Sequence, residues 1–368
     1  MVKKVSLGVV VGIGVVWVLA TFALGLWGKT AAADRLTADL EPAFSNAEAS
    51  QQDAAAVAAF TEELETKTIP FLAEQLHAKP HDVTDLLAST YPAVGRVLSA
   101  KDNSGSKFED GKPYLNHASA YLTGVTAELR TSQDDFSQAS DIPASYLPTK
   151  AVAWLFLLLG LAVLVLGGLL RAKPELGQRL AAGVAGLGLV VIAVTFGLHV
   201  PGKTQALDNV TDSFRPVFTS DGPSSIAEGQ AYLDAVRAAD VELETKVIPA
   251  LPALLRLSPE AVVSALSKNS PIVAGAMLEK DAANPKVSVL GGILDRFDGL
   301  AATVNANVDD FRSTDRIPGL GLPASSVAVL LVGPAILLLL AAAGIAAPRP
   351  ATGDRKAPSA RLAGEMSG

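Results

Sequence analysis

The chain has 368 residues, of which 49% are hydrophobic and 18% charged, with a formal net charge of −7 and no cysteine. So apolar a composition excludes an ordinary soluble protein, and the hydrophobic and charged residues must lie in separate segments. Exported segments of such a chain cannot rely on disulfide bonds and must be held by packing. That favours a bacterial envelope, and we expect no nucleic-acid partner.

Four windows contain no Asp, Glu, Lys or Arg: Val5–Trp27, Ala151–Leu170, Leu180–Val200 and Ala324–Ala347. Each has at least the roughly 20 residues that a helix needs to cross a bilayer. The sequence therefore predicts transmembrane helices at 5–27, 151–170, 180–200 and 324–347. For the first window a cleaved signal peptide is the alternative, but this window is longer than the usual apolar core of about 7–15 residues.

Basic residues are concentrated in the short segments. These hold nine bases and three acids, whereas the two long segments hold 21 bases and 34 acids. Because short cytoplasmic segments retain Lys and Arg, residues 1–4, the loop 171–179 and the tail 348–368 are predicted to be cytoplasmic, the tail being disordered. The segments 28–150 and 201–323 are predicted to be two extracytoplasmic helical domains. We expect a multi-pass protein of the bacterial plasma membrane with both termini in the cytoplasm.

The second half of the chain repeats short motifs of the first half in the same order. Three of the matches are Gly28–Thr30 with 202–204, Glu63–Lys67 with 242–246, and Asp134–Phe136 with 309–311. Pro42 and Phe44 also recur as Pro216 and Phe218, and Ile142-Pro143 recurs as Ile317-Pro318. The offsets lie between 174 and 179 residues. The pattern predicts two parallel tandem repeats, each with a helix, an outer domain and a second helix.

Within the long segments the apolar residues recur at helical spacing. One stripe consists of Leu115, Leu122, Val125, Leu129 and Phe136, and its counterpart of Leu290, Phe297, Leu300, Val304 and Phe311. We therefore predict an all-α membrane protein in which each repeat carries an exported bundle of four or five helices. Phe136 and Phe311 should be buried at matching positions of the repeat core, and Pro70 and Pro249 should kink or end a helix.

Two motifs that are associated with ligand chemistry have simpler interpretations. Residues Gly197–Thr204 match the phosphate-binding loop pattern, but they follow a membrane helix rather than a strand, so we predict no nucleotide partner. His77 and His81 have metal-ligand spacing, yet Pro80 interrupts the helix between them. The sequence predicts no metal site, no cofactor and no catalytic residues.

The pairs Asp134-Asp135 and Asp309-Asp310 are the candidate site residues. Their position near a predicted helix end, where the helix dipole disfavours anions, calls for a partner. A Lys or Arg from a neighbouring helix is the first interpretation, and a cation or partner site near the outer membrane surface is the second.

The predicted membrane helices carry small residues and no charges. Gly8 and Gly12 have GxxxG spacing, and Gly183, Gly186 and Gly188 lie together in the third helix. Such residues allow close helix packing, either within the chain or with another subunit. The absence of intramembrane charges argues against a proton-coupled pump.

Three functional hypotheses follow from this organisation. The first is a non-enzymatic envelope protein whose acidic outer domains bind a partner protein, lipid or wall component. The partners expected for the whole chain are membrane lipid and either a protein partner or a second copy of the chain. The second is a transport or channel component with a path between the repeats, which a polar cavity there would favour. The third is a ligand sensor with paired outer bundles. An apolar groove between outer helices would favour lipid binding.

Overall fold

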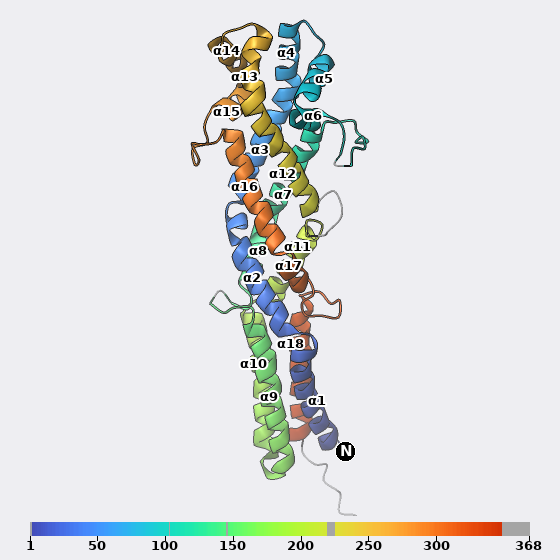
Figure 1. Cartoon of the computed structure of the whole chain (residues 1–368). Coiled ribbons are helices and arrows are strands. Elements are labelled where there is room, and N and C mark those ends of the chain that lie inside the picture. Colours follow the sequence, from blue (N-terminus) through green and yellow to red (C-terminus); the bar gives the residue numbers. More distant parts are fainter. Residues whose placement is uncertain (1, 103, 145, 219–224, 348–368) are drawn as a thin grey trace, which may run out of the picture. The chain divides into compact units, whose positions relative to one another are not determined.

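The computed structural model describes residues 2–102, 104–144, 146–218 and 225–347. The predicted disordered tail, residues 348–368, lies outside the described residues. Within the described ranges the chain forms helices and no strand, apart from four isolated bridges in loops (Figure 1). The prediction of an all-helical protein is confirmed.

Four helices are long and apolar enough to cross a membrane: α1 (Val2–Ala23), α9 (Ala151–Ala172), α10 (Gly177–Gly197) and α18 (Ser326–Ala346). They lie within the four windows free of charge, apart from residues 2–4 of α1, 171–172 of α9 and 177–179 of α10. A bent helix pair, Ile226–Leu255 with Pro259–Asn269, is also long and apolar enough to be one membrane span, judged by length and composition alone. Its first helix carries Arg237, Asp240 and Glu242, which are costly in a bilayer.

Each long segment forms the same series of helical elements. In the first segment these are α2 (Leu26–Ser45), α3 (Ala47–Glu63), the π-helical turn η1 (Leu64–Thr68), α4 (Ile69–Leu76), α5 (Pro80–Thr90), α6 (Pro92–Leu98), α7 (Tyr114–Thr131) and α8 (Gln133–Ser140). In the second they are α11 (Val200–Phe214), α12 (Ile226–Glu242), the π-helical turn η3 (Leu243–Val247), α13 (Ile248–Leu255), α14 (Pro259–Asn269), α15 (Pro271–Leu278), α16 (Val289–Ala306) and α17 (Val308–Thr314). A short 3-10 turn, η2 (Pro174–Leu176), joins α9 to α10.

The chain divides into two compact units. One comprises Met1–Leu19, Phe156–Thr195 and the chain from Leu330 on, and the other comprises Ala20–Leu155 and Phe196–Val329. We call them the apolar-helix unit and the outer unit.

In the apolar-helix unit, glycines allow two close backbone approaches. A side chain at Gly14 would meet the carbonyl oxygen of Gly160 at 3.0 Å, and the reverse distance is also 3.0 Å, so α1 and α9 nearly touch. A side chain at Gly188 would meet the carbonyl oxygen of Ala335 at 2.9 Å, which joins α10 to α18. Trp17 donates a hydrogen bond of 3.1 Å to the carbonyl of Leu330, which ties α1 to α18.

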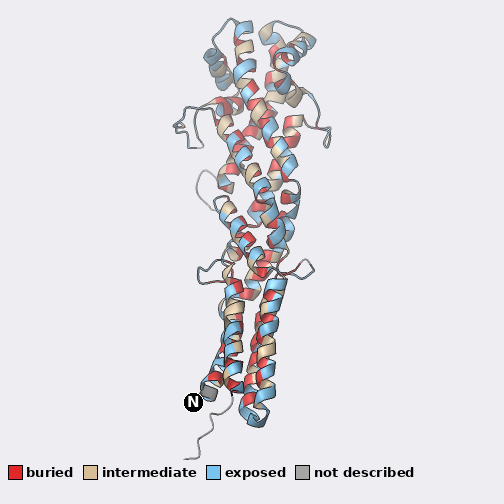
Figure 2. Ribbon diagram, turned by 180° about the vertical axis from the view of Figure 1, so that it is seen from behind, coloured by how far each residue is buried: buried red, intermediate tan, exposed pale blue. Residues whose placement is uncertain are grey.

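The outer unit contains both long segments, so they do not form the two separate bundles that the sequence suggested. Helices of one segment pack against helices of the other: α2 on α17, α8 on α11, and α12 on both α6 and α7 (Figure 1). Buried and exposed residues alternate along the helices of this unit (Figure 2), as expected for helices that each bury one face. Both segments also contribute to each of two buried apolar clusters. The prediction failed because sequence periodicity shows that a helix face is buried, but not which helix covers it.

Candidate functional site

The identical Glu-Leu-Glu-Thr-Lys motifs lie where α3 and α12 pass into the π-helical turns η1 and η3: the first glutamate ends the α-helix, and the other four residues are in the turn. Pro70 and Pro249 follow these turns as the second residues of α4 and α13. Proline has no backbone N–H to donate, and none is needed in the first turn of a helix. The wider π turn before it leaves room for the proline ring, so the chain continues as helix through both prolines. The expected kink or helix end is therefore replaced by a π turn, a feature that often occurs at functional sites.

Each motif begins with a buried glutamate that contacts the other segment. Glu63 Oε2 accepts the backbone N–H of Val273 at 2.9 Å, at the start of α15. Glu242 Oε2 accepts the N–H groups of Ala93 and Val94 at 2.8 and 3.1 Å, at the start of α6. The two glutamates thus cap helices reciprocally and hold the segments together at the π turns.

A lysine four residues later completes each of these contacts. Lys67 and Lys246 lie 3.0 and 2.9 Å from Glu63 and Glu242. Burial alone would raise the pKa of the Glu63 carboxyl, but the N–H of Val273 and the ammonium of Lys67 outweigh it, and the pKa lies below its ordinary value. The pKa of Glu242 is likewise lowered against burial, by Lys246 and the two N–H groups of α6.

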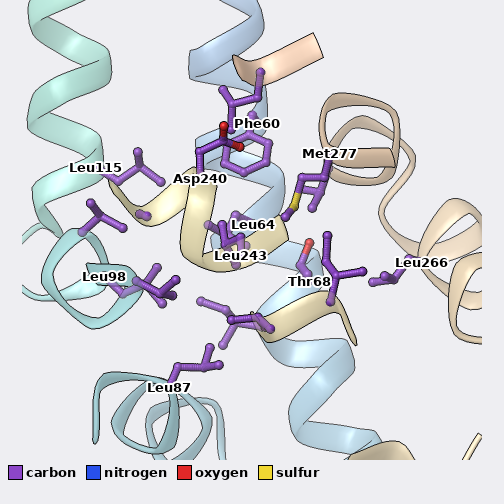
Figure 3. A pocket seen from close by; sticks show the side chains of 18 of the residues that line it. Phe60, Leu64, Thr68, Leu87, Leu98, Leu115, Asp240, Leu243, Leu266 and Met277 are labelled. Carbon is purple, nitrogen blue, oxygen red and sulfur yellow. The ribbon is translucent and has the colours of Figure 1, made fainter. Parts of the chain in front are cut away.

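Between the two π turns lies an apolar cavity, which we call the chamber (Figure 3). Its volume is about 70 Å³. Both segments line it, through α3, η1 and α4 to α7 of the first and η3 and α12 to α16 of the second. The lining includes Phe60, Leu64, Leu87, Leu98, Leu115, Leu243, Leu251, Leu266 and Met277. An apolar cavity of this kind stays dry and accepts apolar ligands.

The chamber has one ionisable side chain, Asp240 of α12. The residue is only 6% exposed, and its Oδ1 atom has no hydrogen-bond partner among the described residues. Figure 3 shows the carboxyl beside Phe60, at the opposite end of the chamber from Leu87. Burial, and then the Glu244 carboxylate, raise the pKa of Asp240 to about 7, against the opposing charge of Arg237.

The predicted aspartate pairs lie at the start of a helix rather than at its end. Ser132 and Asn307 interrupt the long helices, so Asp134 and Asp135 fall in the first turn of α8, and Asp309 and Asp310 in that of α17. The helix dipole favours anions at the start of a helix. The expectation that these aspartates need a partner because the dipole disfavours them was therefore wrong in its reason.

The partners of these aspartates differ between the segments. Asp310 forms an ion pair with Arg35, with 2.8 Å between Oδ2 and Nε. At the matching place Asp135 accepts a hydrogen bond of 3.0 Å from Asn209. Asp134 and Asp309 are exposed. Among the described residues no group of three or more His, Asp or Glu side chains could hold a metal ion.

Phe136 and Phe311 are 5% and 4% exposed and lie in one buried cluster. Each stacks on the phenylalanine of the repeated Pro-x-Phe motif, Phe44 at 3.9 Å and Phe218 at 4.0 Å between ring centroids. The repeated aromatic residues therefore form two equivalent pairs.

The glycines that were predicted to pack helices lie mostly away from other atoms of the chain. Gly8, Gly12 and Gly186 have no atom within 4 Å of a side chain built on them, and Gly183 has only a Leu166 methyl carbon at 3.6 Å. Their packing with another subunit stays a prediction. The close approaches within the chain use Gly14, Gly160 and Gly188, because these face the neighbouring helix.

The lysine of the loop that resembles a phosphate-binding loop is engaged elsewhere. Lys203 Nζ donates to the carbonyl of Asp141 at 2.8 Å, across to the first segment. Its counterpart Lys29 donates to the carbonyls of Arg316 and Pro318 at 2.9 and 3.2 Å, in the second segment. The repeated Gly-Lys-Thr motif therefore joins the segments, like the glutamates of the π turns.

No protein-family model, no curated protein and no solved structure matches the chain. The chamber is thus the candidate functional site on its geometry alone. Sequence reasoning missed it because its lining comes from many short helices of both segments. The one available signal was the identical motif at Glu63–Lys67 and 242–246, which marks the π turns beside it.

Proposed function

We propose that the protein is a membrane-anchored binding protein, built from two duplicated halves, whose outer unit holds the aliphatic part of a small amphiphile in the chamber. The observation that carries the proposal is a cavity lined by apolar side chains of both halves, with a single carboxyl in it. Ligand sites are typically concave and apolar, with few polar groups that fix orientation.

The duplication is supported by the matching order of elements and by matching contacts. Glu63 and Glu242 cap helices of the opposite half, and Lys29 and Lys203 donate to loops of the opposite half. A chamber between two such halves can change size when they move relative to each other, because its walls belong to both.

The apolar lining favours binding over transport of ions. An ion path needs polar groups or water along it, whereas this cavity offers hydrocarbon and one acid. The four apolar helices favour a location in the membrane, where amphiphiles are concentrated. We retain the exported orientation of the outer unit, in a bacterial plasma membrane, as part of the proposal.

The proposal is tested by photolabelling the full chain in lipid nanodiscs with a diazirine-bearing octyl alcohol. Mass spectrometry should find adducts on peptides of the chamber, such as the one containing Met277. Adducts on the apolar helices serve as a positive control for labelling from the bilayer. Adducts confined to those helices would refute the proposal.

A chamber-filling variant gives the matched comparison. Ala239 is 2% exposed and lines the chamber, so Ala239→Leu adds three carbons into the cavity, while Ala56→Leu adds them to the exposed face of α3. We expect Ala239→Leu to lose chamber labelling. The free energy of unfolding should not fall by the about 1–3 kcal/mol that overpacking costs in a filled core, because the added carbons enter a cavity. Ala56→Leu should label like the wild-type protein.

A further inference from the structure

The chamber contains a buried carboxyl group, which a purely apolar cavity would lack. Asp240 is buried at 6% exposure, lines the chamber and leaves Oδ1 without a hydrogen-bond partner among the described residues. A buried acceptor without a partner is costly, and it persists where something else supplies the donor. The matching residue of the first half, Thr61, instead satisfies its hydroxyl by donating to the carbonyl of Val57 at 2.8 Å.

Two acidic and two basic groups lie around Asp240. Glu244 of η3 and Asp295 of α16 add negative charge, and Arg237 of α12 and Lys280, before α16, add positive charge. Arg237 is already paired with Asp295 and Asp298, and Lys280 is exposed. Glu244 also has a buried oxygen, Oε1, without a hydrogen-bond partner in the described chain. A ligand group beside Asp240 therefore meets one carboxyl oxygen that lacks a donor, while the nearby Glu244 adds negative charge from outside the chamber lining.

We propose that the chamber selects amphiphiles whose polar end donates hydrogen bonds and carries positive charge, a primary alkylamine being the simplest, with Asp240 as the residue that receives this group. The inference rests on the proposed function of the chamber. An alkyl alcohol donates one hydrogen bond without charge and should bind less tightly. An alkyl carboxylate brings a third negative charge beside Asp240 and Glu244 and should bind least.

The preference of the chamber for an alkylamine over an alkyl alcohol should depend on pH, because it requires the Asp240 carboxyl to be ionised. Because its pKa is raised to about 7, the carboxyl is mostly ionised near pH 8 and mostly protonated near pH 6. An alkylammonium ion keeps its charge over this range. The preference for the amine over the alcohol should therefore weaken as the pH falls from about 8 to about 6.

The experiment is competition between unlabelled octylamine, octanol or octanoate and the photoreactive octyl alcohol on the full chain in nanodiscs. At about pH 8 we expect octylamine to displace the probe from chamber peptides at a concentration about tenfold lower than octanol does, the usual scale for hydrogen bonds to a charged group. The Asp240→Asn variant keeps the size of the side chain and removes its charge, so this preference should vanish while octanol competes as before. Glu279→Gln, which neutralises an exposed carboxylate outside the chamber, is the control for changes of net charge.

The outcomes separate the two proposals. If chamber peptides are not labelled in the wild-type protein, the proposed function fails and this inference fails with it. If they are labelled but octylamine and octanol compete equally, or Asp240→Asn leaves the preference unchanged, the function stands and the role of Asp240 is refuted. If octanoate competes best, the chamber takes an anionic amphiphile and the inference is likewise overturned.

Discussion

At the scale of single residues, Asp240 should make stability depend on pH. Its ordinary pKa of 3.8 is raised to about 7 in the folded protein. Between these values the folded state holds a proton that the unfolded state has released, so stability falls as the pH rises through this window. The loss is complete above about pH 7 and amounts to about 4 kcal/mol at most.

Asp240→Asn should remove this loss. At about pH 8 the variant should melt at a higher temperature than the wild-type protein, and the difference should close by about pH 4. Asp240→Thr introduces the residue of the matching position and should behave similarly. Thermal unfolding in detergent across this pH range measures the difference. A constant difference at all pH values would show that Asp240 titrates in its ordinary range.

The ion pair between Arg35 and Asp310 should contribute little to stability. The Arg35 side chain is 59% exposed, and exposed pairs contribute about 0–1 kcal/mol. Asn209→Arg would build the matching pair with Asp135 in the other half. We expect it to change the free energy of unfolding by less than about 1 kcal/mol, and less still at high salt. A larger effect of Asn209→Arg or Arg35→Ala would favour the alternative of a functional site at the aspartates.

At the scale of elements, the reciprocal glutamate caps should hold the short helices α6 and α15 in place. Glu63→Gln and Glu242→Gln keep the shape of the side chain but remove its charge. Each should lower stability by about 1–3 kcal/mol, the usual scale for hydrogen bonds to a buried charged group. Hydrogen exchange of the amides of Val94 and Val273 should quicken locally in the respective variant.

Acid should reproduce the effect of these substitutions. The pKa values of both carboxyls lie below 4.5, their ordinary value, in the folded protein. Their contribution is therefore fully present above about pH 4.5 and is lost as the pH falls through the lowered pKa. Glu62→Gln, at an exposed neighbour, is the control and should leave both stability and exchange unchanged. Equal effects of Glu62→Gln and Glu63→Gln would contradict the capping role.

Helix positions and buried faces could be predicted from the sequence because they depend on local composition. Windows without charge located the four apolar helices, and helical spacing identified Phe136 and Phe311 as buried. The break at Ser132 was missed, so Asp134 and Asp135 were placed near the wrong end of a helix. One break in a helix is enough to reverse the sign of the dipole interaction, because the residues after the break lie at the start of a new helix.

Contacts between the halves could not be predicted from the repeat. Identical residues at Glu63 and Glu242 show that the same contact is made twice, but not whether it lies within a half or between halves. The same holds for Gly8 and Gly14, because the spacing of small residues does not say which face meets a neighbour. The chamber is formed by these tertiary contacts, so it could not be predicted from the sequence either.

At the scale of the whole molecule, the proposed topology can be tested on a chain that has no cysteine. Single cysteines at the exposed residues Ser104 and Ala282 should react with a membrane-impermeant thiol reagent in intact cells, because both long segments are predicted to be exported. A cysteine at Gln178, an exposed residue in the first turn of α10 and within the predicted cytoplasmic loop 171–179, should react only after the cells are opened. Labelling of Gln178→Cys alone in intact cells would invert the topology.

The interlocked halves should depend on each other for folding. Glu63, Glu242, Lys29 and Lys203 all find their partners across the halves. The ion pair of Arg296 with Asp53, at 2.7 Å, also joins them. A half expressed alone would leave buried carboxylates and helix ends without partners, which costs about 1–3 kcal/mol for each group, against a total stability of about 5–15 kcal/mol for a typical protein.

We therefore expect that a chain split between Pro174 and Glu175, in the loop that joins α9 to α10, can be reassembled from its two parts. When both halves are co-expressed, a tag on one should copurify the other in equal amount. Glu63→Ala together with Glu242→Ala should weaken this association, and the paired control Glu62→Ala with Glu279→Ala, both exposed, should not. Expressed alone, a half should be degraded or should pair with a second copy of itself, since the matching residues could then supply the missing partners. A half that is stable as a monomer would show that its folding does not need the other half, and would contradict the interlocked arrangement.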